Sequence, residues 1–178
     1  MIPSVVEQSP EPVGGSGTCG YLFRMPIVSV TRLRLRAWFF IPPFLFTSMP
    51  IGKQVRKAPG FLGGLLLMDA GRTFWTVSVW KDRASMQAFR NGGSHGRSMP
   101  KLGRWVEHAR LANWEQEGTE VPGWEALYAR LTESGRPSQV EHPAADHAGP
   151  NAFPMPKQDG WREGKLEPIE AGKKSGKV

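Results

Sequence analysis

The chain has 178 residues with a net charge of +7, and its single cysteine, Cys19, excludes an intramolecular disulfide. This length predicts one domain, or one domain with tails, and the longest apolar run, residues 37–46, is too short and too interrupted by proline to span a membrane. The basic charge favours an anionic ligand or surface, but no helix-turn-helix, zinc-finger or aromatic RNA-binding motif indicates nucleic acid, and we expect a cytoplasmic protein.

Glycine and proline gather at the two ends of the sequence and divide it into three parts. Residues 1–24 predict a disordered arm, and Met25, which opens the first patterned segment, is a second candidate translation start besides Met1. Residues 25–134 predict one globular domain, large enough to fold without disulfides or bound metal ions. Residues 135–178 have almost no periodicity and predict an extended tail. Three apolar residues could dock this tail on the domain: Trp161, Leu166 and Ile169.

The first element in chain order is a strand at residues 27–37, where the sequence alternates with period two. Thr31, Leu33 and Leu35 point to one side of this strand. Three arginines point to the other side: Arg32, Arg34 and Arg36. The paired prolines at 42–43 suit the first turn of a helix, where a missing N–H costs nothing. We predict this helix at residues 44–57, with a kink at Pro50.

The middle of the sequence predicts a hairpin, because two strand-like runs flank the turn residues Ala70 and Gly71. The runs cover residues 61–69 and 72–80, and the second is rich in β-branched and aromatic residues. Asp82 is a natural N-cap for the helix that follows. The remaining predicted elements are that helix at 83–91, a second helical segment from about 98 to 109, a strand at 110–115 and a helix at 123–131.

The order of these elements is β-α-β-β-α-β with one helix added, which predicts an α+β domain of the ferredoxin-like kind. In this fold an antiparallel sheet carries its helices on one face. The other face must also be covered, and a second copy of the chain would cover it, giving a homodimer or dimeric α/β barrel. The alternative is that the chain covers it with its own C-terminal tail. The arginine row lies on this second face, either toward a ligand or toward solvent.

Four segments resemble one family: residues 30–36 (VTRLRLR), 58–64 (APGFLGG), 73–80 (TFWTVSVW) and 86–91 (MQAFRN). They are similar to the spheroidene monooxygenase-like branch of the dimeric α/β-barrel superfamily, which includes the antibiotic biosynthesis monooxygenases. The resemblance covers roughly residues 25–115. It implies a ferredoxin-like fold that dimerises through its sheets. It also implies a monooxygenase-like enzyme for an apolar or polycyclic small molecule, with haem in the branch and without metal or flavin in the antibiotic-type members.

His95, in the Gly/Ser-rich stretch 91–97, matches by position the iron ligand that the resemblance implies. Neutral imidazole is the common proximal ligand of haem iron, although a histidine in such a stretch is more often solvated. The strand arginines Arg32, Arg34 and Arg36 would then anchor the haem propionates, because a guanidinium binds a carboxylate through two hydrogen bonds.

Asn91 and Arg97 are the candidate catalytic residues beside His95. Asn91, like Asn113, could orient bound oxygen, and Arg97 could contact an acidic group of the ligand. No dinucleotide fingerprint, Walker loop or Gly-x-Ser-x-Gly motif is present. Three functions therefore stay open: a haem-binding monooxygenase-like enzyme, a cofactor-free oxygenase, cyclase or isomerase, and a non-catalytic binding domain for an anionic ligand.

Overall fold

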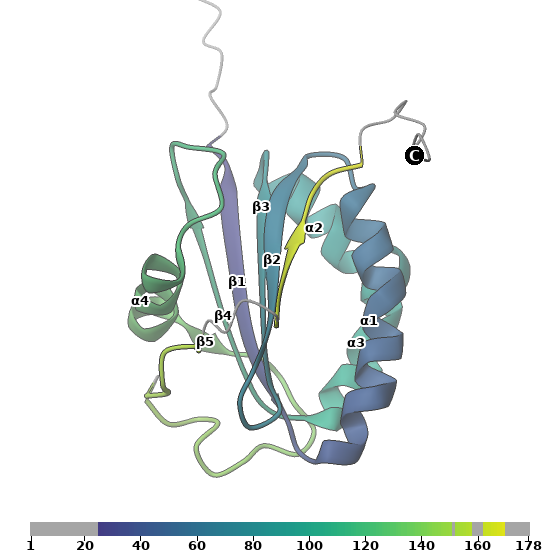
Figure 1. Ribbon diagram of the computed structural model, residues 1–178, viewed down its shortest axis with the longest axis vertical. Coiled ribbons are helices and arrows are strands. Elements are labelled where there is room, and N and C mark those ends of the chain that lie inside the picture. Colours follow the sequence, from purple (N-terminus) through teal and green to yellow (C-terminus); the bar gives the residue numbers. More distant parts are fainter. Residues whose placement is uncertain (1–24, 151, 158–161, 170–178) are drawn as a thin grey trace, which may run out of the picture.

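The computed structural model describes residues 25–150, 152–157 and 162–169. Their strands form one antiparallel sheet in the order β5-β4-β1-β3-β2-β6 (Figure 1). The strands are β1 (Ile27–Leu35), β2 (Phe61–Asp69), β3 (Thr73–Trp80), β4 (Val106–Glu115), β5 (Arg136–Pro137) and β6 (Glu163–Leu166). The helices are the short 3-10 helix η1 (Trp38–Phe40), α1 (Ile41–Arg56), α2 (Arg83–Asn91), α3 (Gly93–Trp105) and α4 (Trp124–Ser134).

The predicted α+β fold class is confirmed, because the sheet is antiparallel and its four central strands follow the ferredoxin-like order β4-β1-β3-β2. The predicted arm at 1–24 lies outside the described residues. Within those residues, none of the helices is both long and apolar enough to cross a membrane.

Strand β1 shows how the sequence pattern produces two different sheet faces. Its even-numbered residues, including Val28 and Val30, pack in the cluster that contains α4. Its odd-numbered residues, including Ser29 and Thr31, border the space under α1, α2 and α3. We call the first side the second face and the other side the cavity face. The strand ends at Leu35, two residues earlier than predicted, where its pairing with β4 is shifted by an irregularity.

Helix α3 differs from the sequence prediction, because it begins at Gly93 instead of near 98. Gly92 ends α2 and serves as the N-cap of α3, so the two helices meet without a loop. The side chain of Gln54, from α1, holds this junction. Its amide nitrogen donates to the carbonyl oxygens of Phe89 and Gly92 at 3.3 and 3.1 Å. Its oxygen accepts from the backbone N–H of His95 at 2.9 Å. Residues predicted as a loop are therefore the first turn of a helix.

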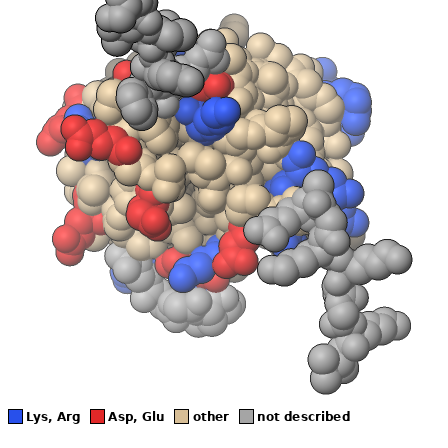
Figure 2. All heavy atoms as spheres, turned by 90° about the horizontal axis from the view of Figure 1, so that it is seen from above, with Lys and Arg blue, Asp and Glu red and all other residues tan. Residues whose placement is uncertain are grey.

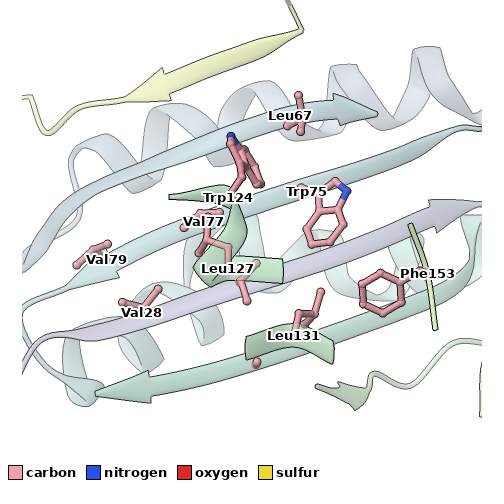
Figure 3. Close-up of a cluster of buried hydrophobic side chains, with 11 residues drawn as sticks. Val28, Leu67, Trp75, Val77, Val79, Trp124, Leu127, Leu131 and Phe153 are labelled. Carbon is pink, nitrogen blue, oxygen red and sulfur yellow. The ribbon is translucent and has the colours of Figure 1, made fainter. Parts of the chain in front are cut away.

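Helices cover both faces of the sheet. The helices α1, α2 and α3 lie on the cavity face, and α4 lies on the second face (Figure 1). Trp124, Leu127 and Leu131 of α4 pack on β1, β3 and β4, and Phe153 from the segment after α4 joins them (Figure 3). The second face is thus covered by this chain itself, through α4 and the segment after it, which is close to the second of the two alternatives. The prediction of a homodimer is not tested by this packing.

The segment after α4 also pairs with both edges of the sheet. Arg136 and Pro137 form β5 against β4, and Glu163–Leu166 forms β6 against β2. Between them, the backbone N–H of Glu141 donates to the carbonyl of Gly103 in α3 at 2.9 Å. The described part of this segment therefore lies against the domain along most of its length.

Candidate functional site

A cavity of about 1020 Å³ lies between the cavity face of the sheet and the helices α1, α2 and α3. Small-molecule sites in proteins usually have volumes of roughly 300–1,000 Å³, so this space is large enough for a polycyclic ligand. Most of its wall is apolar. The apolar residues that line it include Phe44, Ile51, Val55, Met86, Phe89 and Leu102.

The floor of the cavity carries a row of uncharged polar side chains. Ser29 of β1 is the register partner of Ser78 in β3 and of Asn113 in β4, and all three line the cavity. Two residues further along β1, on the same face, Thr31 is paired with Thr76 of β3. Cross-strand partners place their Cβ atoms about 4.5–5.5 Å apart, so these side chains form a continuous polar strip.

Two buried polar atoms beside the cavity have no hydrogen-bond partner among the described residues. They are the amide oxygen Oδ1 of Asn113 and the indole nitrogen Nε1 of Trp80. Both residues line the cavity. Buried polar groups are normally paired, and a missing bond costs about 1–3 kcal/mol. These two atoms are fully buried, so the groups available to a bound molecule are the serine and threonine hydroxyls of the floor.

His95 contributes the one ionisable side chain that is partly buried in this wall. Its Nδ1 lies 2.9 Å from the carbonyl oxygen of Arg90. Because a carbonyl oxygen only accepts, Nδ1 carries the hydrogen, and in the neutral ring Nε2 holds the lone pair. Burial lowers the pKa of His95, and its contact with the Arg90 carbonyl opposes this effect. The ring is therefore neutral near pH 7, with Nε2 free to accept a proton or bind a metal ion.

Two further neighbours fix the position of His95. The Gln54 side chain accepts from its backbone N–H, and the Phe89 ring lies against the imidazole with ring centroids 4.9 Å apart. Gln54 also binds the end of α2. Three helices therefore determine where this ring stands, which is the kind of support that a catalytic or ligating side chain needs.

The other predicted site residues do not join His95. Asn91 and Arg97 are exposed and do not line the cavity. Arg32 and Arg34 project from the second face, on the far side of the sheet from His95. Arg36 lies beyond the end of β1, exposed, with its guanidinium 4.7 Å from the centre of the Phe40 ring.

Arg32 is a buried cation in a mainly aromatic and histidine surrounding. It is 5% exposed, and its Nη1 donates to Nδ1 of His108 at 3.2 Å. Its guanidinium lies 4.6 Å from the centre of the Phe153 ring, so cation–π attraction replaces part of its lost hydration. Burial, and then repulsion from Arg34, lower the pKa of Arg32 to about 10. Residues of this chain thus engage its Nη1 and the face of its guanidinium, whereas its Nε has no hydrogen-bond partner among the described residues.

Arg34 is likewise engaged within the protein. It donates to Glu107 at 2.7 Å and to Asp146 at 2.9 Å. This hydrogen bond to Arg34 lowers the pKa of Asp146. The guanidinium of Arg110, which is 4% exposed, donates to the carbonyl oxygens of His147 and Gly149. The arginines of the second face therefore hold the segment that crosses them.

The structure fits a haem group only in part. No cluster of three or more metal-binding side chains exists among the described residues, although a haem iron needs only one axial histidine. His95 meets that need, because metal-binding histidines usually donate their other ring N–H to a carbonyl or carboxylate. The predicted propionate anchors Arg32 and Arg34 lie on the opposite side of the sheet from His95, so they would not contact a haem bound by His95. Among the described residues, the arginines that line the cavity are Arg90 and Arg136, and both are exposed.

Sequence reasoning did not assign the polar floor as a site. The available signal was the occurrence of Ser29, Thr31, Thr76 and Ser78 at positions that alternation assigns to a sheet face covered by helices. A sequence that served only to pack a core would have apolar residues at such positions. Uncharged polar residues there therefore point to function. Gln54 carried no comparable signal, because its role depends on the meeting of three helices.

Comparisons with known proteins give similarity in structure but not in sequence. No protein-family model matches the chain, and no curated protein matches it. Several solved structures are similar. One, a candidate antibiotic biosynthesis monooxygenase from Nitrosomonas europaea, is 14% identical, covers 54% of this chain and 94% of its own, and has a TM-score of 0.48.

Two further solved structures give the same result. The cofactor-independent oxygenase SnoaB from Streptomyces nogalater is 13% identical over 52% of this chain and 94% of its own, with a TM-score of 0.44. A conserved protein from Methanosarcina mazei is 12% identical over 52% of this chain and 93% of its own, with a TM-score of 0.48. These similarities concern the fold, and nothing in them is specific to the spheroidene monooxygenase branch.

Proposed function

We propose that this protein is a monooxygenase-like enzyme that binds an apolar, oxygen-bearing small molecule in the cavity and uses His95 as the proton acceptor. The observation that supports this most is the placement of His95, with Nδ1 2.9 Å from the Arg90 carbonyl oxygen, in the wall of a largely apolar cavity with a polar floor. The apolar walls suit the carbon skeleton of the ligand. The strip formed by Ser29, Ser78 and Asn113 suits its carbonyl or hydroxyl groups.

The residues of the cavity would act on a substrate whose C–H or O–H bond is acidic. Nε2 of His95 accepts that proton, and the anion that remains is held by hydroxyl and amide donors of the floor. Molecular oxygen is the oxidant. For an activated methylene group the balance is R₂CH₂ + O₂ → R₂C=O + H₂O, so both oxygen atoms are accounted for and no separate reductant is consumed.

The test of this proposal is oxygen-dependent turnover of a tricyclic aromatic ketone with an activated methylene, such as anthrone. We expect quinone formation by the parent protein and a loss of about 10²–10⁴-fold in His95→Ala, the usual contribution of general acid–base catalysis. Lys57→Ala, at an exposed site outside the cavity, is the control and should retain full activity. Equal rates in the His95 variant and the parent would remove His95 from the reaction.

A haem-dependent enzyme is the second candidate, because the hydrogen bond from Nδ1 of His95 to the Arg90 carbonyl is the arrangement that ligating histidines show. Bound haem would supply the oxygen chemistry, while the protein would orient it and exclude water. Titration with hemin should then give a Soret band in the parent that is lost in His95→Ala and kept in Lys57→Ala. Equal hemin uptake by the His95 variant would contradict this assignment.

The non-catalytic binding domain for an anionic ligand has less support from the cavity. Apart from His95, the charged side chains that line it, Arg90, Arg136 and Glu141, are all exposed at its rim. An anion in the interior would therefore lose hydration without gaining a buried cation. The homodimer and the cytoplasmic location stay predictions.

A further inference from the structure

The outer surface formed by η1, α1 and α3 is unusually apolar for a surface. Of the ten large hydrophobic side chains that are exposed in the described residues, six lie there. Three are aromatic and project strongly, with exposed fractions of 66% for Trp38, 71% for Phe39 and 74% for Phe46. The other three are Leu45, Met49 and Met99. Exposed apolar side chains are normal when scattered, whereas a continuous group of them marks an interaction surface.

The helices that form this surface carry only positive charge. No aspartate or glutamate occurs between residues 36 and 68, or between residues 93 and 106. Exposed cations extend the apolar group on both helices: Lys53 and Lys57 from α1, and Arg97 and Lys101 from α3. Figure 2 shows blue side chains along the edge where α1 and α3 lie in Figure 1, and red side chains mainly along the opposite edge.

The spacing along α1 places both kinds of residue on one stripe. Phe46, Met49, Lys53 and Lys57 follow one another at intervals of three and four residues, which brings them to the same side of a helix. Helices that lie in the interface of a bilayer have this composition, because the apolar side chains enter the acyl region while lysine extends its ammonium group toward lipid phosphates. Basic residues strengthen such binding when the lipids are anionic.

We propose that the η1–α1–α3 surface docks on an anionic lipid bilayer. A second copy of this chain is a poorer occupant, because a two-fold contact would bring the same cations face to face. A neutral apolar protein surface would leave Lys53, Lys57 and Lys101 without compensating charge. A lipid surface matches both the apolar side chains and the cations. Its acyl chains would surround Phe46, and its phosphate groups would pair with the ammonium groups of the lysines.

The position of the cavity relates this docking to catalysis, an inference that rests on the proposed function. Met99 is 48% exposed on the outer surface and also lines the cavity, as does the neighbouring Pro100. Ile51 and Gly52 of α1 line it as well. The cavity therefore lies directly beneath the docking helices, so an apolar substrate dissolved in lipid could reach it without crossing water.

The experiment is flotation of the full chain with vesicles of phosphatidylcholine alone and of phosphatidylcholine with roughly 30% phosphatidylglycerol, at low and at high salt. We expect binding to the anionic vesicles that falls with salt. Because each basic residue near such a surface contributes a factor of about five, Lys53→Glu with Lys57→Glu should bind at least about 30-fold more weakly. Phe46→Asp with Met49→Asp should also lose binding. The matched control, Met155→Asp, changes an exposed methionine elsewhere and should bind like the parent.

Three results would overturn the proposal. They are absence of binding to both vesicle types, equal binding to neutral and anionic vesicles, and concentration-dependent self-association that Phe46→Asp with Met49→Asp abolishes, which would assign the surface to a second copy. Circular dichroism of each variant checks that the exposed substitutions leave the fold intact. Since vesicle binding is measured without any substrate, its outcome is independent of turnover by His95.

Discussion

Replacing Trp75 by alanine is expected to lower the free energy of unfolding by about 3–5 kcal/mol, the range for removing a large aromatic side chain from a core. Trp75 is 0% exposed and stands at the centre of the second-face cluster (Figure 3). Its ring meets Trp124 of α4 edge-on at 6.1 Å and Phe153 at 5.8 Å between centroids. Its Nε1 also donates to Asp69 at 3.2 Å. One substitution therefore weakens the contact of the sheet with α4 and with the segment after it.

Urea denaturation of the parent and of two comparison variants measures this effect. Trp75→Phe keeps an aromatic ring but loses the bond to Asp69, so its loss of stability should be smaller. Trp38→Ala removes the same side chain at a site that is 66% exposed, and should change stability by no more than about 0.5 kcal/mol. A Trp75→Ala loss below about 1 kcal/mol would mean that the second face is not packed as described.

Lowering the pH from 7 to 4 is expected to destabilise the protein by about 3 kcal/mol through His108. Burial, and then the charge of Arg32, lower the pKa of His108 from 6.5 to about 4. The folded state thus binds a proton less readily than the unfolded chain, whose histidine titrates near 6.5. The contribution is fully present above pH 6.5 and is lost as the pH falls toward 4. Arg32, Arg34, Asp146 and His147 act on this histidine.

The measurement is the free energy of unfolding as a function of pH for the parent and for His108→Asn. Asparagine keeps an acceptor near the position of Nδ1, so it can still receive the hydrogen bond from Arg32 while it has no proton to bind. The variant should lose most of the slope between pH 6.5 and 4. A smaller slope persists, because burial also lowers the pKa of His95, so the folded state again binds a proton less readily than the unfolded chain. The lowered pKa of Asp146 adds to the loss of stability only near and below pH 4. His142→Asn, at an exposed site, should keep the full slope of the parent.

The elements that sequence reasoning predicted well are those whose pattern is local. Alternation predicts the strand at 27–35, and an apolar run followed by β-branched and aromatic residues predicts the hairpin at 61–80. Asp82 caps α2 as expected, accepting from the backbone N–H of Ser85 at 2.8 Å. The start of α3 could not be predicted in this way. Gly92 and Gly93 have low helix propensity, and the bonds that compensate come from Gln54, about 40 residues earlier in the chain.

The candidate site was only partly predictable for a similar reason. His95 lies in the cavity wall, as a ligand-contacting residue should. The arginine row is predicted to face a ligand or solvent, because the sequence does not reveal its partners. Two of those partners, Asp146 and Phe153, come from the segment after α4, which has no periodic pattern. A row of arginines on a sheet face has the same sequence whether a ligand or the chain itself covers it.

The pairing of β5 and β6 has a consequence for how the protein behaves when it is trimmed. These two short strands occupy the outer hydrogen-bonding edges of β4 and β2. Exposed strand edges are templates for pairing between molecules, and natural proteins protect them. A chain cut after residue 134 would present both edges at once, and β2, with the sequence FLGGLLLMD, combines high apolarity with a single charge. Proteolytic removal of the C-terminal segment would thus make the remaining domain prone to aggregation.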